Sequence, residues 1–81
     1  ATGRTLGRQC GERLIGFSAE LGGKNAMIVA AGADLDEVAE VATRAFFSTS
    51  GQLCISVERV YVERSVAPQL IEKLTARVRS M

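Results

Sequence analysis

The chain has 81 residues, with ten basic and nine acidic side chains, two cysteines and no histidine. A chain of this length forms one domain at most and buries only about 60% of its unfolded surface, near the lower limit for an independent core. Its net charge of +1 gives no reason to expect nucleic acid or a membrane as a partner. The lack of histidine excludes a Ser-His-Asp triad, a Cys-His pair and a histidine-containing zinc site, so we expect no metal.

The two cysteines, Cys10 and Cys54, are too few for a disulfide scaffold and lack the paired spacing of a structural metal site. They favour a reduced, cytoplasmic setting. No run of about 18 apolar residues occurs, so we expect no membrane span. The chain starts at Ala1 without a basic or apolar leader, and we interpret it as the interior of a longer sequence.

Helical and extended patterns alternate along the chain, which predicts an α/β fold with parallel strands. The first pattern, over residues 2–14, predicts a helix with Cys10 on its apolar, core-facing row. Beside that row runs a second one of glycines spaced four apart: Gly3, Gly7 and Gly11. Each interior glycine costs about 1 kcal/mol relative to alanine, so we expect this row to pack against structure outside the chain.

Two short apolar runs, residues 15–19 and 26–30, predict strands buried on both faces, with residues 21–25 as the loop between them. Asp34 then predicts a helix start, with Glu37 as its capping-box partner. The apolar stripe of this helix consists of Leu35, Val38, Ala42, Ala45 and Phe46.

That helix fades at residues 48–51, and residues 57–62 are a β-rich strand. A last helix is predicted from an N-cap at Ser65, and it tolerates Pro68 in its first turn. Its apolar row consists of Val66, Leu70, Leu74 and Val78.

Cys54 and Glu20 are the candidates for chemistry. Cys54 follows a polar break after a helix, and it is either a buried small hydrophobe or a nucleophile. Without histidine, its thiolate would have to be favoured by backbone N–H groups, a helix terminus or a nearby cation. Glu20 is either a strand-end residue that reaches solvent or a partly buried general base that activates water. The glycines at 22 and 23 would let the backbone approach a flat ligand closely.

Two motifs appear in a fixed order. Glu20-Leu21-Gly22-Gly23-Lys24 is followed by Phe47 and then by Gly51-Gln52-x-Cys54, in which Cys54 stands 34 positions after Glu20. In this order and at this interval, the motifs resemble the glutamate and cysteine signatures of the NAD(P)-dependent aldehyde dehydrogenase superfamily. The similarity extends over essentially the whole chain.

The resemblance implies a mechanism. Cys54 would attack the aldehyde carbon, hydride would pass to the nicotinamide of NAD or NADP, and Glu20 would activate the water that hydrolyses the thioester to a carboxylic acid. The oxyanion would be held by the Cys54 N–H and by an asparagine outside this chain. The resemblance also implies cofactor contacts at Gly3, Leu21 and Gly22.

By the same resemblance, the fold is part of the aldehyde dehydrogenase fold, an α/β architecture. Residues 1–22 would end its Rossmann-like dinucleotide-binding domain, and residues 23–81 would begin its catalytic domain. The complete enzyme would act on a small-molecule aldehyde as a homo-oligomer. We expect the 81-residue chain alone to be inactive, because the oxyanion asparagine and the adenine- and pyrophosphate-binding residues are absent from it.

Within the family, residues 17–19 and 53–59 are most similar to bacterial succinate-semialdehyde dehydrogenases, which implies succinate semialdehyde as a substrate. Ser48 stands where several of these enzymes have an arginine that helps to bind a substrate carboxylate, and Thr49 stands where asparagine is usual. Ser56 stands where some relatives have a second cysteine, so we expect no disulfide switch.

Two alternatives stay open. One is a small non-catalytic α/β packing or interaction module in which Cys54 and Glu20 are structural. The other is a degenerate paralogue that keeps the family's sequence but has lost its reaction. The coupled pair of motifs favours the enzyme over the packing module, because such a module has no reason to carry both at this interval.

Overall fold

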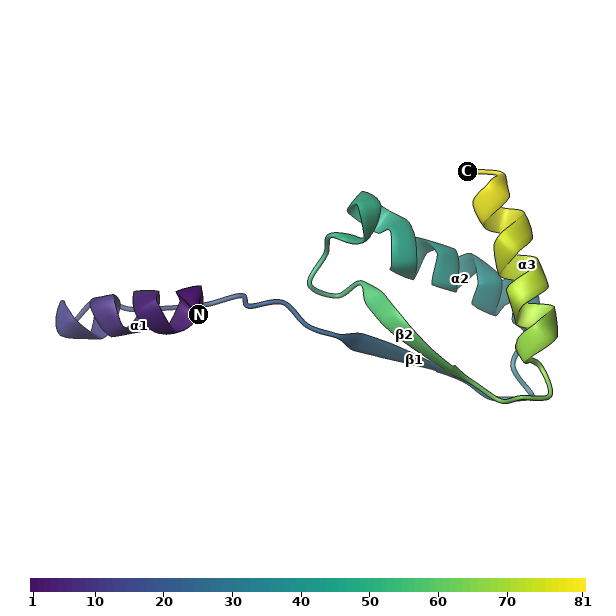
Figure 1. The fold of residues 1–81 in the computed structure, drawn as a ribbon, viewed down its shortest axis with the longest axis horizontal. Coiled ribbons are helices and arrows are strands. Elements are labelled where there is room, and N and C mark those ends of the chain that lie inside the picture. The colour runs from purple at the N-terminus through teal and green to yellow at the C-terminus, as the bar shows by residue number, and fades with distance from the viewer.

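Two strands pair in parallel, as the alternating pattern predicts: β1 (Asn25–Val29) with β2 (Val57–Val62). Because a tight turn cannot join parallel neighbours, the chain crosses over between them as α2 (Leu35–Phe47) and the 3₁₀ turn η1 (Ser48–Gly51). A last helix, α3 (Ala67–Arg79), follows β2. The computed structural model describes the whole chain, and both α2 and α3 lie on one side of the sheet (Figure 1).

The core lies between this sheet and the two helices. Its fully buried members are Val29, Ala39 and Leu70, and partly buried apolar residues pack around them: Met27, Ala33, Leu35, Val38, Val62 and Leu74. Ile28, between two inward-facing neighbours on β1, is 83% exposed. The prediction that this strand is buried on both faces is therefore wrong for this chain, because no second layer covers the far face of the sheet.

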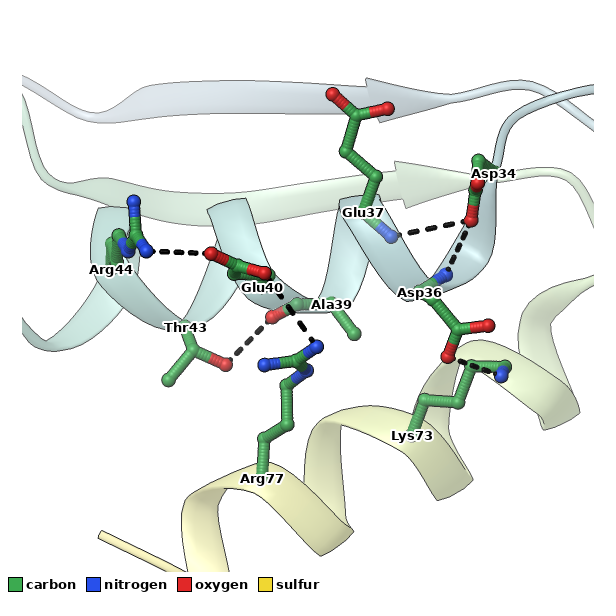
Figure 2. A network of polar contacts seen from close by, with 9 residues as sticks. All are labelled: Asp34, Asp36, Glu37, Ala39, Glu40, Thr43, Arg44, Lys73 and Arg77. Carbon is green, nitrogen blue, oxygen red and sulfur yellow. Dashed lines mark hydrogen bonds and ion pairs between the residues drawn. The ribbon is translucent and has the colours of Figure 1, made fainter.

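The start of α2 confirms Asp34 as its N-cap. The Asp34 carboxylate accepts hydrogen bonds from the backbone N–H groups of Asp36 at 2.9 Å and Glu37 at 3.3 Å. The predicted capping box is only half formed, since the Glu37 side chain returns no bond to the Asp34 N–H. Its carboxylate extends away from Asp34, toward the strands (Figure 2).

The start of α3 differs from the prediction. Ser65 is not the N-cap; Val66 holds that position, and no side chain caps the helix. The reason is a preceding turn, in which the N–H groups of Val66 and Ala67 both donate to the Glu63 carbonyl. The chain therefore enters the helix through backbone bonds, and Pro68 occupies the first turn as predicted.

The first helix, α1 (Thr2–Glu12), stands apart from the rest of the molecule (Figure 1). It ends before the predicted residue 14, where Leu14 takes a left-handed φ of 54°. No residue of α1 is buried, so Cys10 is only half-buried and not part of a core.

Residues 15–19, predicted as a strand, form none. A strand needs a neighbour for its backbone groups, and no other strand of this chain lies beside this run. The run instead turns back along α1, where Leu21 covers Gly3 and Phe17 covers Gly7. The chain itself therefore covers part of the glycine row, at Gly3 and Gly7, and Gly11 faces open space. Packing of this row against structure outside the chain stays a prediction.

Ion pairs join the exposed sides of α2 and α3 (Figure 2). Lys73 Nζ lies 2.5 Å from Asp36 Oδ1, and Arg77 reaches Glu40 at 3.8 Å. Glu40 also accepts from Arg44, one turn along its own helix, at 2.6 Å. Because these pairs are exposed to solvent, they align the two helices and add only modestly to stability.

The Asp36–Lys73 pair predicts a pH dependence. The hydrogen bond from Lys73, and then its charge, hold the pKa of Asp36 below the ordinary value. A lowered carboxyl pKa contributes stability that is present above the unfolded-state pKa of about 3.9 and is lost as the pH falls through the folded-state value. Asp36→Asn should therefore lower the unfolding temperature at pH 6, and the difference from the unmodified protein should shrink below about pH 4.

Thermal unfolding followed by circular dichroism across this pH range measures the effect. The matched control is Glu72→Gln, which changes an exposed carboxylate on α3 and should show little difference from the unmodified protein at any pH. A constant Asp36→Asn difference from pH 6 to pH 3 would contradict the assignment.

Candidate active site

Cys54 lies exposed at the apex of a turn between η1 and β2. The turn is closed twice: the Ser56 N–H donates to the Leu53 carbonyl at 3.0 Å, and the Leu53 N–H donates to Ser56 Oγ at 3.3 Å. Ser56 is only 3% exposed, the one buried polar residue of the chain. The thiol is therefore accessible, unlike that of a buried structural cysteine, and the Cys54 N–H makes no hydrogen bond within the protein.

The chain reaches this turn through a strained segment. Thr49 and Ser50 both have left-handed backbones, with φ of 51° and 57°. Such conformations cost an ordinary residue about 1 kcal/mol or more, and a β-branched residue is least suited to them. Gly51 follows with φ of 72°, and a Cβ there would stand 2.9 Å from the Phe46 carbonyl oxygen, so only glycine fits. These three residues turn the chain sharply out of α2 toward Cys54.

Glu20 lies away from the Cys54 turn, in the segment of residues 17–21 that runs back along α1. A hollow of about 460 Å³ there is lined by eight residues: Thr2, Gly3, Leu6, Phe17, Ser18, Ala19, Glu20 and Leu21. Glu20 itself is exposed, so these residues alone do not supply the partly buried setting of a general base. The structure thus brings together three of the predicted site residues, Gly3, Glu20 and Leu21. Cys54 and Gly22 do not line this hollow, and Gly22 has a left-handed φ of 79°.

The segment after Glu20 is nevertheless tied to the Cys54 turn. Asn25 Nδ2 donates to the Cys54 carbonyl at 2.6 Å and to the Ser56 carbonyl at 3.2 Å. The backbone at Gly23 passes close by, since a Cβ there would stand 3.4 Å from the Cys54 carbonyl oxygen. The glutamate motif and the cysteine motif therefore meet through Asn25.

A further pair of contacts fixes the same segment to β2. Arg59 Nη2 donates to the Lys24 carbonyl at 2.7 Å, and Lys24 Nζ lies 2.5 Å from Glu58. The strand register slips by one residue at this point, between Asn25 and Ala26. Sequence reasoning assigned no role to Asn25, Ser56 or Arg59. The only local signals were an asparagine directly after a motif and a serine next to a β-rich run.

The hollow around Gly3 lies beside a helix start that suits an anion. α1 starts without a side-chain cap, and the free N–H groups and the dipole of a helix start favour an anion. A Cβ on Gly3 would stand 2.8 Å from the end of the Leu21 side chain, so a larger residue there would displace that exposed side chain. His, Cys, Asp and Glu side chains do not gather in threes that could hold a metal ion. None of the helices is long and apolar enough to span a membrane.

Comparisons with known proteins identify the class. The family model for the aldehyde dehydrogenase family matches residues 1–81, the whole chain. The fold matches the crystal structure of an aldehyde dehydrogenase from Brucella melitensis biovar abortus 2308 with a TM-score of 0.91 and 38% identity, over 99% of this chain and 17% of that one. An NAD-dependent aldehyde dehydrogenase from Sinorhizobium meliloti matches with a TM-score of 0.88 and 35% identity, over 95% of this chain and 15% of that one.

The chain therefore belongs to the aldehyde dehydrogenase family, and its α/β fold is a segment of that family's fold. Among individual relatives, it is 68% identical over all 81 residues to a protein of Mycolicibacterium smegmatis named as a succinate-semialdehyde dehydrogenase (NADP(+)). The chain spans 16% of the length of that relative. The family resemblance inferred from the two motifs is confirmed.

The strained segment before Cys54 yields a prediction. Thr49→Asn should stabilise the protein by about 1 kcal/mol, because asparagine tolerates the left-handed conformation that threonine disfavours. The midpoint of guanidinium unfolding measures the change. Thr75→Asn, on the exposed side of helical α3, is the matched control and should give no gain. An equal or smaller midpoint for Thr49→Asn than for the unmodified protein would contradict the strain.

Proposed function

We propose that this chain supplies the nucleophile and the general base of an enzyme that oxidises an aldehyde to a carboxylic acid with NAD or NADP. The observation that carries the proposal is the exposed Cys54 turn, tied by Asn25 to the segment that follows Glu20. An accessible thiol linked in this way to a segment that carries an exposed carboxylate suits a thiol nucleophile with a water-activating partner. Family membership supports the same chemistry.

The chain's own residues divide the reaction between them. The Cys54 thiolate adds to the aldehyde carbon, and the free Cys54 N–H can donate to the oxyanion that forms. The nicotinamide ring, when bound, supplies the acceptor for the hydride that leaves this carbon. The acyl group then remains on Cys54 as a thioester. Glu20 takes a proton from the water that attacks the thioester, which releases the carboxylic acid and frees the thiol.

Cofactor binding at Gly3, Leu21 and Gly22 is part of the proposal. The shallow hollow beside the uncapped start of α1 supports it, since Gly3 and Leu21 both line that hollow. Relatives are named for either cofactor: the Mycolicibacterium smegmatis protein for NADP(+) and the Sinorhizobium meliloti structure for NAD. We therefore keep NAD or NADP as the cofactor. A reducing, cytoplasmic setting belongs to the same proposal, since the nucleophile must remain a free thiol.

The proposal also covers the substrate, which is supported by sequence identity, and the domain arrangement, which is supported by packing. The 68% identity to a protein named as a succinate-semialdehyde dehydrogenase supports succinate semialdehyde as the aldehyde. We also propose that residues 1–22 end the dinucleotide-binding domain and residues 23–81 begin the catalytic domain of a homo-oligomeric enzyme. In support, α1 packs against the chain that returns from it, whereas α2 and α3 share a separate core with the sheet.

Replacing Cys54 tests the nucleophile. In the full-length enzyme, Cys54→Ala should lower kcat by about a thousandfold or more, because no other group forms the thioester. Production of NADH or NADPH from succinate semialdehyde, followed at 340 nm, measures it. Cys10→Ala, which removes the chain's other free thiol, is the matched control and should keep normal turnover. Full activity in Cys54→Ala would end the enzyme proposal and favour a packing role for this chain.

Replacing Glu20 tests the base. Glu20→Gln should slow thioester hydrolysis by about a hundredfold and leave acylation intact, since the amide cannot accept the proton from water. Stopped-flow measurement should then show a full burst of reduced cofactor followed by slow turnover. Glu12→Gln, an exposed carboxylate of α1, is the control and should show wild-type rates. Unchanged deacylation in Glu20→Gln would remove Glu20 from this role.

A further inference from the structure

We propose that Asn25 and Ser56 are positioning residues that hold the Cys54 turn in its reactive conformation. This inference rests on the proposed function, in which Cys54 is the nucleophile. It starts from a physical difficulty: the side chain that must be accessible lies on an exposed turn, and exposed turns are mobile unless their backbone is fixed. Hydrogen bonds fix the peptide groups on both sides of Cys54.

Ser56 fixes the peptide groups before Cys54. Its backbone N–H donates to the Leu53 carbonyl at 3.0 Å, and that carbonyl shares a rigid peptide plane with the Cys54 N–H. Its hydroxyl oxygen accepts from the Leu53 N–H at 3.3 Å, which fixes the preceding plane. Because Ser56 is only 3% exposed, its hydroxyl is held in place by packing and the N–H it accepts from is shielded from competing water.

Asn25 fixes the peptide group after Cys54. Its Nδ2 donates to the Cys54 carbonyl at 2.6 Å and to the Ser56 carbonyl at 3.2 Å. Asn25 is the first residue of β1 and lies opposite Val57 in the parallel register, so the amide projects from a paired strand and not from a loop. The bond therefore fixes the position of the Cys54 turn relative to the sheet.

The Ser56 N–H and the Asn25 amide thus fix the two peptide planes that flank the Cys54 Cα, and the Ser56 hydroxyl fixes the plane that precedes them. The two flanking planes determine the φ and ψ of Cys54, and with them the directions of its Cβ and its N–H. Both groups act on the same carbonyl carbon in the proposed reaction, one as nucleophile and one as oxyanion donor. Loss of either clamp should therefore lower the rate of acylation more than it weakens aldehyde binding.

The test uses the full-length enzyme and two pairs of variants. Asn25→Asp keeps the shape of the side chain but loses the N–H donor, and Ser56→Ala loses the hydroxyl. Each should lower kcat and the burst rate by about tenfold, with the KM for succinate semialdehyde changed less than twofold. Ser56→Thr retains the hydroxyl and should recover most of the rate. Gln69→Glu and Ser80→Ala, exposed positions in and directly after α3, are the matched controls and should leave both rates unchanged.

The outcomes separate the two proposals. Variants that unfold at lower temperature but keep the burst rate per folded molecule would overturn the positioning role, as would equal rates in Ser56→Ala and Ser56→Thr. If Asn25→Asp does not fold, the Ser56 pair decides alone. An inactive Cys54→Ala beside a fully active Asn25→Asp would overturn the positioning proposal only. Activity in Cys54→Ala would instead remove the proposed function on which it rests.

Discussion

The parallel pairing of β1 with β2 is the constraint on which the rest of this structure depends. It places Asn25 opposite Val57, so the chain that leaves the glutamate motif arrives beside the chain that leaves the Cys54 turn. Because parallel strands require a crossover, the same pairing forces α2 onto the sheet and gives the core its second layer. The exposed Cys54 turn thereby gains a hydrogen-bond partner, Asn25, on a paired strand.

The segment between α2 and β2 follows a strained path. A relaxed path would avoid two successive left-handed residues, Thr49 and Ser50, and would not need glycine at position 51. The strained path turns the chain sharply between the end of α2 and the Cys54 turn. Backbone strain of this kind persists only where surrounding contacts over-determine it, and it gathers at functional sites. Here the buried Ser56 follows Cys54 along the chain, and the Asn25 amide of β1 bonds to the Cys54 carbonyl.

The open surfaces of the chain are consistent with its place in a larger family fold. One face of the sheet is uncovered, with Ile28 83% and Tyr61 56% exposed, and α1 contributes no buried residue. Aldehyde dehydrogenase relatives are about six times the length of this chain, since it spans 15% to 17% of those compared. In this setting, the exposure of Glu20 reflects its position beside α1, at a distance from the main core.

The sequence by itself determined the local features: three helices, the two strands of the parallel pair, the Asp34 cap and the two motifs that mark the family. Each depends on residues that are close together in the chain, or on motifs at a fixed interval. Only the tertiary structure decided the rest. Residues 15–19 match a strand pattern but form no strand, because a strand exists only with a neighbour. Ser65 is not the N-cap of α3, because a backbone turn at Glu63 leads into the helix and leaves Val66 at that position. The Asn25 contacts were equally invisible, since they join residues about thirty positions apart and no local pattern encodes them. Ser56 bonds to Leu53 only three positions away, but its burial depends on the packing of the whole fold.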